Sequence, residues 1–310
     1  MLELLSVIQI ILIELFGKSK SMFKKKIIVL GSSGMIGHMI YHFLKKINKF
    51  LLFNLAGSRK INNKTTIIDV QDFEKIKIYI DEIKPDYIIN CIGILINESK
   101  KNLKKAIYLN ALFPHLLDDL SFKLNYKLIH ISTDCVYSGN KEEPYTEFDE
   151  KDGLGNYSKT KGLGEIINDK NLTLRTSVVG PELKIDGEEL FNWFMLQNEI
   201  INGFTNVFWS GISSLELAKA VLWGIENDIK GLYNLTNGIR ISKNDLLMIM
   251  NKYSKKKIKI NPIESVFSDK SFLDTRKEIN YNFPSYELMI KELFTHIRNN
   301  TFLYPHYKLN

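Results

Sequence analysis

The sequence has few cysteines and lacks the residue spacing of a metal site. Its 310 residues include only two cysteines, Cys91 and Cys135, which excludes a disulfide-stabilised scaffold and indicates a reducing compartment. The six histidines are scattered, and no group of Cys or His residues has zinc-ligand spacing. We therefore expect a cytoplasmic protein without a bound metal.

An apolar run of membrane-spanning length is also missing. Residues 4–16 are apolar but are interrupted by Glu14, and they fall short of the roughly 20 residues that a membrane span needs. A signal peptide would carry positive charge before its apolar stretch, whereas here the lysines follow it. We expect residues 1–21 to be an N-terminal extension, with Met22 as an alternative start, and no stable membrane span. An interfacial anchoring helix is the second interpretation.

Acidic residues are slightly outnumbered, with 35 Asp and Glu against 42 Lys and Arg, so the net charge is +7. The excess comes from short lysine runs, which are typical of a solvated face. A weaker interpretation is attraction to an anionic ligand such as a phosphorylated cofactor or a nucleotide sugar. Because no nucleic-acid-binding motif accompanies these runs, we expect no nucleic-acid partner.

Strand and helix patterns alternate through the first 180 residues. The apolar run 26–31 ends in glycine, and residues 35–47 repeat apolar positions every three or four residues, as one face of a helix does. The further strands predicted are 50–57, 65–70, 87–93, 127–139 with its exit loop, and 171–180; the further helices are 72–84, 100–124 and the segment around 156–165. This alternation predicts an α/β fold with a Rossmann-type doubly wound parallel sheet, which binds ligands at the carboxyl ends of its strands.

The rhythm changes after Pro181. An aromatic helix at 190–197 is followed by a strand-like stretch, a helix at 213–227 opened by Ser213 or Ser214, and a mixed segment near the end. We predict a nucleotide-binding domain made of residues 22–180 plus about 205–240. A smaller, discontinuous substrate-binding lobe would comprise about 181–204 plus 241–310.

Three glycines, Gly31, Gly34 and Gly37, lie between the first strand and its helix. In such a string one glycine makes a tight turn, one lets the backbone approach a pyrophosphate, and one lets helix and strand pack closely. The helix start adds free N–H groups and a partial positive charge. A dinucleotide site is therefore predicted, and the alternative is a plain glycine-rich turn.

The end of the second predicted strand bears on the choice of dinucleotide. NAD-binding folds usually place an acid there to bind the ribose, but this strand is followed by Arg59 and Lys60. A cation at this position suits the 2′-phosphate of NADPH, and NADH is left open. The alternative is that Arg59 is an ordinary surface charge.

Tyr157 and Lys161 stand four residues apart, on one face of a predicted helix. Such a pair also occurs by chance and proves nothing alone. A nearby ammonium would lower the pKa of the Tyr157 phenol and make it a better proton donor near neutral pH. Ser132, Thr133 and Asp134 end an earlier strand, where a hydroxyl could bind a substrate carbonyl.

The glycine string, the strand-end Ser/Thr and the Tyr-x-x-x-Lys pair, in this order, resemble the extended short-chain dehydrogenases/reductases. Within that superfamily the chain is most similar to the dTDP-4-dehydrorhamnose reductase family. The segments that carry the resemblance are KPDYIINCIG, YLNALFP, HISTDCVYSG, YSKTKGLGE, LRTSVVGP and the late SFLDTRKEINYNFPSYELMIKELF. The resemblance itself extends over nearly everything from Met22 onward.

The resemblance implies hydride transfer from NADPH to the 4-keto carbon of a nucleotide-linked 6-deoxy sugar, in the synthesis of cell-surface polysaccharide precursors. It places the catalytic hydroxyl on Thr133, the proton donor on Tyr157 and the family's lysine on Lys161. The implied cofactor positions are Gly31, Ser33, Gly34, Met35, Ile36, Gly37, Arg59, Asp69, Val70, Cys91, Ile92, Gly93, Asn110, Tyr157 and Lys161. The candidate substrate contacts are Thr133, Asp134, Glu182, Lys184 and Trp193, of which the last three are alternatively loop charges and a core tryptophan.

Two departures leave parts of this interpretation open: the residues before a late Ser-x-Leu-Asp, and the segments GPELK (180–184) and FNWFM (191–195), which differ from what is expected of rhamnose-pathway enzymes. The family often has an arginine just before a late Ser-x-Leu-Asp, where this chain has Lys270, with Arg276 further on. The contact to the diphosphate, the nucleotide (dTDP or UDP), the sugar and a homodimer are therefore left open. The alternative functions are an epimerase or dehydratase of the same superfamily, against which Arg59 argues, and a non-catalytic NADP-binding regulatory subunit. The presence of Thr133, Tyr157 and Lys161 argues against a regulatory subunit.

Overall fold

A computed structural model describes residues 24–276 and 280–308. The predicted extension 1–21, including the apolar run 4–16, lies outside the described residues. Among the helices of the described segments, none is both long and apolar enough to cross a membrane.

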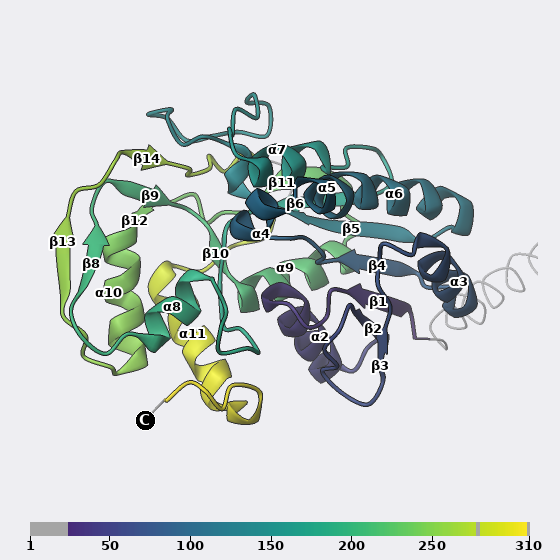
Figure 1. Ribbon diagram of the computed structural model, residues 1–310, viewed down its shortest axis with the longest axis horizontal. Helices are drawn as coiled ribbons and strands as arrows, with labels where there is room; N and C mark the ends of the chain where they lie inside the picture. The colour runs from purple at the N-terminus through teal and green to yellow at the C-terminus, as the bar shows by residue number, and fades with distance from the viewer. Residues whose placement is uncertain (1–23, 277–279, 309–310) are drawn as a thin grey trace, which may run out of the picture.

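A seven-stranded parallel sheet forms the centre of the larger half of the molecule (Figure 1). Its strands, in spatial order, are β11 (Gly231–Asn234), β6 (Leu172–Arg175), β5 (Lys127–Ser132), β4 (Tyr87–Asn90), β1 (Lys26–Leu30), β2 (Leu51–Ala56) and β3 (Thr65–Ile67). The chain runs outward from β1 to β3 and then returns to β4 on the other side of β1. This reversal between β1 and β4 is the switch point at which doubly wound sheets bind ligands. The predicted fold class is confirmed.

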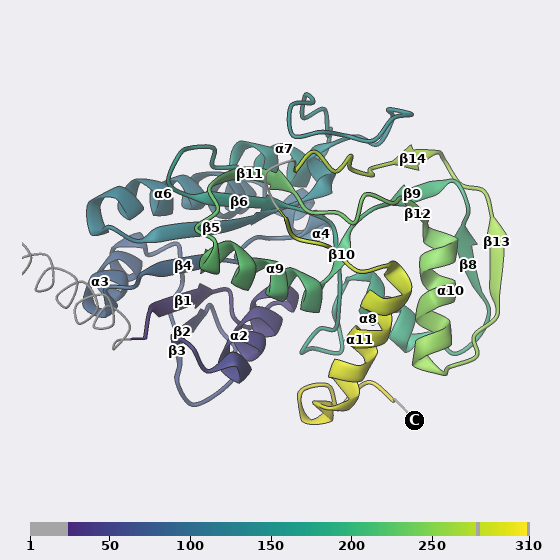
Figure 2. The same ribbon diagram turned by 180° about the vertical axis from the view of Figure 1, so that it is seen from behind.

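Helices cover both faces of the sheet, which explains why its strands are apolar throughout. Side chains of β1 alternate between two cores: Ile27 and Val29 point to one, Ile28 and Leu30 to the other. The first core is shared with α2 (Met35–Ile47) and α9 (Ser214–Glu226). The second is shared with α3 (Phe73–Ile83) and α6 (Phe113–Leu124), which lie on the opposite face (Figure 2).

The single helix predicted at 100–124 is in fact four consecutive helical segments. These are α4 (Ile96–Lys101), α5 (Leu103–Ala106), the π-helix η1 (Ile107–Leu112) and α6. Asn102 separates α4 from α5. Its side chain accepts a hydrogen bond from Lys105 N (3.0 Å) and so caps the start of α5. Pro114 lies in the first turn of α6, directly after the π-helix.

The smaller lobe packs beside the sheet and is built from late segments (Figure 1). Its helices are α8 (Leu190–Leu196), α10 (Lys243–Ser254) and α11 (Tyr286–Arg298). Strand β8 (Ile201–Phe204) pairs with β13 (Ile260–Ile263), and β9 (Val207–Trp209) lies between β12 (Ile241–Ser242) and β14 (Ser268–Asp269).

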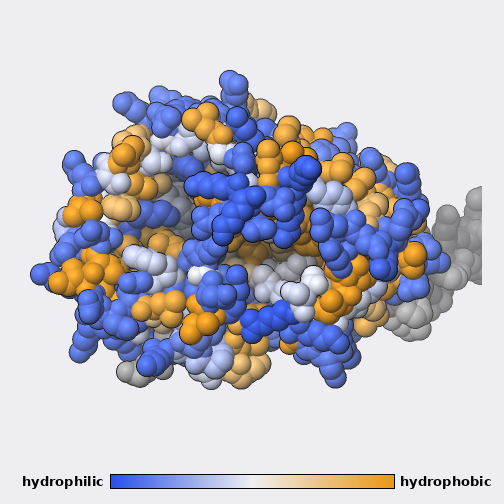
Figure 3. All heavy atoms as spheres, in the orientation of Figure 1, coloured by the Kyte–Doolittle hydropathy of each residue, from blue (hydrophilic) through white to orange (hydrophobic). Residues whose placement is uncertain are grey.

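After the lobe the chain rejoins the seven-stranded sheet only at β11, and a separate two-stranded sheet forms before that. Strand β9 hydrogen-bonds only within the lobe, whereas β10 (Ile212–Ser213) pairs with β7 (Val178–Val179). Ser213 then caps α9 by accepting from Glu216 N (3.1 Å), as its capping signature predicts. The division into two folding units stays a prediction. On the face shown in Figure 3, hydrophilic residues are interspersed with apolar ones, as expected of a solvated surface.

A buried ion pair joins Arg175, at the end of β6, to Glu165, which follows α7 (Asn156–Leu163). The guanidinium donates two hydrogen bonds to the carboxylate, of 2.7 Å from Nε and 2.6 Å from an Nη. Both side chains are almost fully buried, with exposed fractions of 1% and 0%. Burial alone would raise the pKa of Glu165, but the hydrogen bonds and charge of Arg175 outweigh it and lower that pKa.

Further polar groups complete this ion pair. Ser132, the last residue of β5, donates to Glu165 (2.7 Å), and Lys151 lies 3.2 Å from the same carboxylate. Arg175 donates its remaining hydrogen bonds to Tyr137 (2.6 Å) and to Asn234 of β11 (3.2 Å). The network thus ties three strands of the sheet to the end of α7.

Removing one partner of this pair should destabilise the protein strongly. We expect Arg175→Leu to lower the free energy of unfolding by about 3–5 kcal/mol, because Glu165 would remain buried without its counter-charge. Urea denaturation followed by circular dichroism measures this change. Lys49→Met is the control, since its ion pair with Glu226 is largely exposed and is expected to contribute little. Similar small losses in both variants would contradict the account.

Candidate active site

Two of the three glycines in the first turn are required by the backbone. Gly31 has a positive φ of 76° and, with Ser32, donates its N–H to Leu55 O at 2.9 Å. A Cβ at Gly37 would come within 2.2 Å of Gly31 O, so only glycine lets α2 pack this closely. At Gly34 the backbone would accept another residue, because its φ is −79° and an added Cβ would approach nothing closer than 3.4 Å. An exposed glycine with no internal reason to be glycine fits the position at which a ligand approaches the backbone.

The start of α2 is open to an anion. The helix has no acidic residue in its first turn and no side-chain cap, so its first N–H groups keep their hydrogen-bonding capacity. Ser33, Met35 and Ile36 are partly exposed around it. The predicted pyrophosphate positions therefore surround an accessible helix N-terminus, which is suited to a phosphate group.

The loop that follows β4 lies directly against this glycine turn. Cys91 N donates to Leu30 O (3.1 Å), and a Cβ on Gly31 would come within 3.1 Å of the Cys91 backbone. Cys91, Ile92 and Gly93 were predicted to flank the middle of the cofactor. The structure brings them together with the glycine turn at the switch point of the sheet.

Asn110 holds the same loop from the π-helix. Its side chain accepts from Ile94 N (2.9 Å) and donates to Ile94 O (3.1 Å) and to Thr160 of α7 (3.2 Å). A Cβ at Gly164 would collide with Asn110 O at 1.9 Å, so α7 ends in tight contact with this residue. Asn110 thus connects the cofactor loop with the helix that carries Tyr157.

The predicted adenosine-side residues follow the neighbouring strands β2 and β3. Arg59 is exposed and makes no hydrogen bond or ion pair with other described residues, which leaves its guanidinium available. The Asp69 carboxylate accepts from Gln71 N (3.0 Å), so it shapes its own turn. Val70 is buried, and its carbonyl accepts from Tyr108 (3.0 Å).

Tyr157 and Thr133 form the centre of the site. Burial raises the pKa of the Tyr157 phenol, the nearby Cys135 adds to the rise, and a hydrogen bond with the Thr133 side chain opposes it. Thr133 Oγ1 also accepts from Cys135 N (3.1 Å) and donates to Asp134 (3.2 Å). Ser132 instead donates to the buried Glu165, which favours Thr133 over Ser132 as the reactive hydroxyl.

Lys161 is buried one turn after Tyr157 on α7, and its ammonium donates to Ile131 O (2.8 Å). Burial lowers the pKa of Lys161 to about 8, with the charge of Glu165 acting in the opposite direction. The predicted lowering of the Tyr157 pKa is contradicted, because desolvation of the phenol dominates and the ammonium bonds the strand carbonyl. The spacing of the pair was informative, but the electrostatic effect inferred from it was not.

The three further candidates lie on the loop and helix after β7. Glu182 is buried, and its carboxylate accepts a hydrogen bond from Glu189 N (3.1 Å), so it stabilises the loop itself. Lys184 is exposed on that loop, and Trp193 on α8 is 40% exposed. Within the described segments, no hydrogen bond or ion pair joins these side chains to Thr133 or Tyr157. Their contacts with a substrate stay a prediction.

The sequence analysis missed two charged residues that face the centre of the site. Burial raises the pKa of Glu189 to about 7; Glu182 adds to this rise, and the charge of Lys243 opposes it. Burial lowers the pKa of Lys243, with the charges of Asp134 and Glu189 opposing. Its ammonium lies 5.2 Å from the ring centroid of Trp209 and makes no hydrogen bond or ion pair with any other described residue. No sequence signal marks these positions, because only the folding of the lobe brings them here.

Lys270 comes to the same place from a third segment. Its charge acts on Lys243 and on Cys135, and the side chain lies against Gly139, whose added Cβ would meet it at 3.0 Å. Like Lys243, it has no hydrogen bond or ion pair in the described part of the chain. Two lysines of the lobe thus face the turn that carries Thr133 and Asp134.

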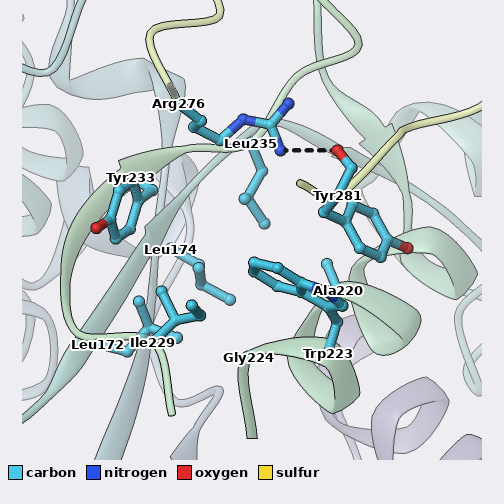
Figure 4. A pocket seen from close by; sticks show the side chains of 10 residues that line it. All are labelled: Leu172, Leu174, Ala220, Trp223, Gly224, Ile229, Tyr233, Leu235, Arg276 and Tyr281. Carbon is cyan, nitrogen blue, oxygen red and sulfur yellow. Dashed lines mark hydrogen bonds between the residues drawn. The ribbon is translucent and has the colours of Figure 1, made fainter. Parts of the chain in front are cut away.

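Other places offer less chemistry. A small pocket between α9 and strands β6 and β11 has apolar walls, and its one cation, Arg276, is already paired with Asp274 at 2.7 Å (Figure 4). No cluster of three or more His, Cys, Asp or Glu residues with metal-binding geometry occurs in segments 24–276 and 280–308. Cys91 and Cys135 are both free thiols.

Curated relatives match about half of the chain. The spore coat polysaccharide biosynthesis protein SpsK of Bacillus subtilis (strain 168) is 27% identical over 141 residues, which are 45% of this chain and 47% of the relative. The dTDP-4-dehydrorhamnose reductase of Aggregatibacter actinomycetemcomitans is 26% identical over 158 residues, or 49% of this chain and 51% of the relative. The chain therefore spans about half the length of these relatives in the match.

The fold is shared over a longer stretch. The crystal structure of a dTDP-4-dehydrorhamnose reductase from Bacillus anthracis str. Ames, in complex with NADP, superposes with a TM-score of 0.76. The match covers 88% of this chain and 99% of that one at 20% identity, which shows the fold. A family model described as the RmlD substrate binding domain matches residues 25–270, which is well over half of the chain. The resemblance seen in the motifs is thereby confirmed, and the chain belongs to the RmlD substrate binding domain family.

Proposed function

We propose that this protein is an NADPH-dependent reductase of the 4-keto group of a nucleotide-linked 6-deoxy sugar, similar to dTDP-4-dehydrorhamnose reductase. The observation that carries the proposal is the joint placement of Thr133, Tyr157 and Lys161 beside an accessible glycine turn. The names of the two curated relatives support the reaction class and a role in cell-surface polysaccharide synthesis.

The residues present fit a phosphorylated dinucleotide. Gly34 and the open start of α2 would hold the pyrophosphate, and the unpaired Arg59 would bind the 2′-phosphate. The loop Cys91–Gly93 and Lys161 would border the ribose and nicotinamide. When bound, NADPH supplies the hydride. The NADP complex of the Bacillus anthracis structure supports this choice.

Side chains of the protein would bind the substrate carbonyl and supply the proton. The Thr133 hydroxyl is placed to hydrogen-bond the substrate oxygen and orient it toward Tyr157. Because burial raises its pKa, the Tyr157 phenol stays protonated and serves as the proton donor to the developing alkoxide. The ammonium of Lys161 is held by Ile131 O (2.8 Å), so its role would be to hold the cofactor rather than to shift the pKa of the phenol.

Lys243 and Lys270 suit the diphosphate of the substrate. Both carry ammonium groups without hydrogen bonds to other described residues, and they reach the site from the lobe. Charge-assisted hydrogen bonds to phosphate oxygens would satisfy them. We infer that the lobe binds the nucleotide end of the substrate, and we place the reaction in the cytoplasm, where NADPH is available. A homodimer stays a prediction.

The direct test supplies the protein with NADPH and a panel of dTDP- and UDP-linked 4-keto-6-deoxy sugars generated in situ. Loss of NADPH absorbance with one of them would support the reductase and name its substrate. Conversion of a sugar without NADPH consumption would favour the epimerase or dehydratase alternative. Tight NADPH binding without turnover of any sugar would favour the regulatory subunit.

Replacing the proton donor should separate binding from turnover. We expect Tyr157→Phe to bind NADPH nearly as the wild type does, because the ring and its packing are kept. Turnover should fall by roughly a hundredfold or more, since general-acid catalysis is lost. Steady-state kinetics and fluorescence titration measure the two effects. Unchanged turnover would show that another group donates the proton.

The low pKa of Lys161 predicts a pH dependence of cofactor binding. Below pH 8 the side chain is an ammonium with hydrogens to donate, and above it the proton is progressively lost. The dissociation constant of NADPH should therefore rise as the pH increases through about 8. Lys161→Met should bind weakly at every pH and show no such step. An identical pH profile in both proteins would rule out this role.

Replacing Lys243 should weaken binding of the nucleotide sugar but not of NADPH. We expect Lys243→Met to raise the KM for the sugar by roughly tenfold, the size of one lost charge-assisted hydrogen bond. The dissociation constant of NADPH should not change. Lys252→Met is the matched control, because Lys252 lies on the same helix but is exposed and paired with Glu287. An equal effect in the control would point to helix stability rather than substrate binding.

A further inference from the structure

The C-terminal segment after α11 contacts both halves of the molecule. It passes through η3 (Thr301–Leu303) and continues to residue 308, lying below α11 in Figures 1 and 2. Tyr304 and Tyr307 are 1% and 6% exposed, although they belong to the end of the chain. Buried hydroxyls need hydrogen-bond partners, and these two find theirs far away in the sequence.

Tyr304 reaches the cofactor helix. Its hydroxyl lies 2.9 Å from His38 Nε2, and His38 Nδ1 lies 2.9 Å from Gly34 O. Burial lowers the pKa of His38 to about 3, so the imidazole is neutral and has one N–H. A carbonyl only accepts, so Nδ1 must carry that hydrogen, and Nε2 accepts from Tyr304. The chain of bonds from Tyr304 thus ends on the glycine at the start of α2.

Tyr307 reaches the loop before α8. Its hydroxyl accepts from Glu182 N (3.0 Å) and donates to Asn192 Oδ1 (2.9 Å). Asn192 is fully buried and donates in turn to Ile185 O (3.0 Å) and Gly187 O (2.9 Å). One hydroxyl therefore holds the beginning of the loop 181–189 directly and its middle through Asn192 of α8.

The loop closes tightly around these contacts. Glu182 accepts from Glu189 N, and an added Cβ at Gly187 would lie 2.0 Å from the Glu182 carboxylate. Glu189, at the end of the loop, acts electrostatically on Tyr157 and Asp134. A shift of this loop would therefore move charge at the reacting centre.

His306 lies between the two tyrosines and extends the contact toward the adenosine side. Burial lowers its pKa, a hydrogen bond with the Glu182 backbone opposes this, and the charge of Arg59 lowers it further. The segment thus borders the loop, and Arg59 is near enough for its charge to act on His306. Tyr304, His306 and Tyr307 span both predicted subsites within four residues.

We propose that residues 301–308 form a strap that positions residues 181–192 against the cofactor helix α2. These residues are the loop 181–189 and the start of α8, and Tyr307 and Tyr304 are the positioning residues of the strap. The strap's role in turnover rests on the proposed function, but its effect on the loop does not. The Tyr307 hydroxyl bonds Glu182 N and Asn192 Oδ1, so Tyr307 would act through these two residues.

The test removes one hydroxyl and follows the loop directly. In Tyr307→Phe, we expect amide hydrogen exchange in peptides covering 181–192 to speed up by about tenfold, because a buried N–H and a buried carbonyl lose their partner. The KM for the nucleotide sugar should rise while the dissociation constant of NADPH stays near that of the wild type. Tyr126→Phe is the matched control, since Tyr126 is equally buried and donates to Leu117 O (2.6 Å) away from the strap.

Tyr304→Phe is the second variant and keeps both bonds to the loop. It frees His38 from its anchor, so we expect weaker NADPH binding and little change in loop exchange. Wild-type exchange in the loop of Tyr307→Phe, or the same acceleration in Tyr126→Phe, would overturn the proposal. A wild-type protein that reduces no sugar would defeat the proposed function instead, and the exchange measurement would still decide whether the strap positions the loop.

Discussion

The ion pair between Arg175 and Glu165 is the constraint on which the site depends. It lies under the carboxyl end of the sheet, where an unpaired charge would be costly, so every hydrogen bond around it must be made. Those bonds fix the end of β5 through Ser132, the end of β6 through Arg175 itself, and the start of the segment after α7. Thr133 directly follows β5, and Tyr157 lies on α7, the helix that precedes Glu165. A buried network that contains neither Thr133 nor Tyr157 thus supports the elements next to them.

The polar residues of the site divide into groups that are satisfied internally and groups that are not. Ser132, Glu182 and Asn110 have their hydrogen bonds filled by the protein. Lys243, Lys270 and Arg59 do not, within the described residues. Cations that the fold leaves unpaired are available for phosphate groups; Arg59 follows β2 of the large sheet, whereas Lys243 and Lys270 belong to the lobe. This arrangement suits two phosphate-bearing ligands that meet at Tyr157.

The parts of the structure that rest on short-range patterns were predictable. The strand-turn-helix containing Gly31 and Gly37 follows from local geometry, and the alternation of strands and helices led to the doubly wound sheet. The helix at 100–124 was not resolved into its pieces, because the π-helix at Asn110 is stabilised by tertiary contacts with Ile94 and Thr160. Local periodicity cannot report such contacts.

The site likewise contains residues that could be predicted from the sequence and residues that could not. Tyr157 was singled out by its spacing from Lys161 and Thr133 by the family resemblance, and the structure brings the two together. The direction of the Tyr157 pKa shift was predicted incorrectly, since spacing says nothing about desolvation. Glu189 and Lys243 were missed because they reach the site only when the lobe folds against the sheet. The roles of Tyr304 and Tyr307 likewise depend on contacts more than 100 residues away in sequence.

The most direct test of this account is the fate of the transferred hydrogen. The protein would be incubated with a 4-keto-6-deoxy nucleotide sugar and NADPH that carries deuterium at its transferable position, and the product examined by nuclear magnetic resonance. The account predicts deuterium on C4 of the sugar, with one cofactor oxidised for each product formed. A product without deuterium, or a label at another carbon, would contradict it.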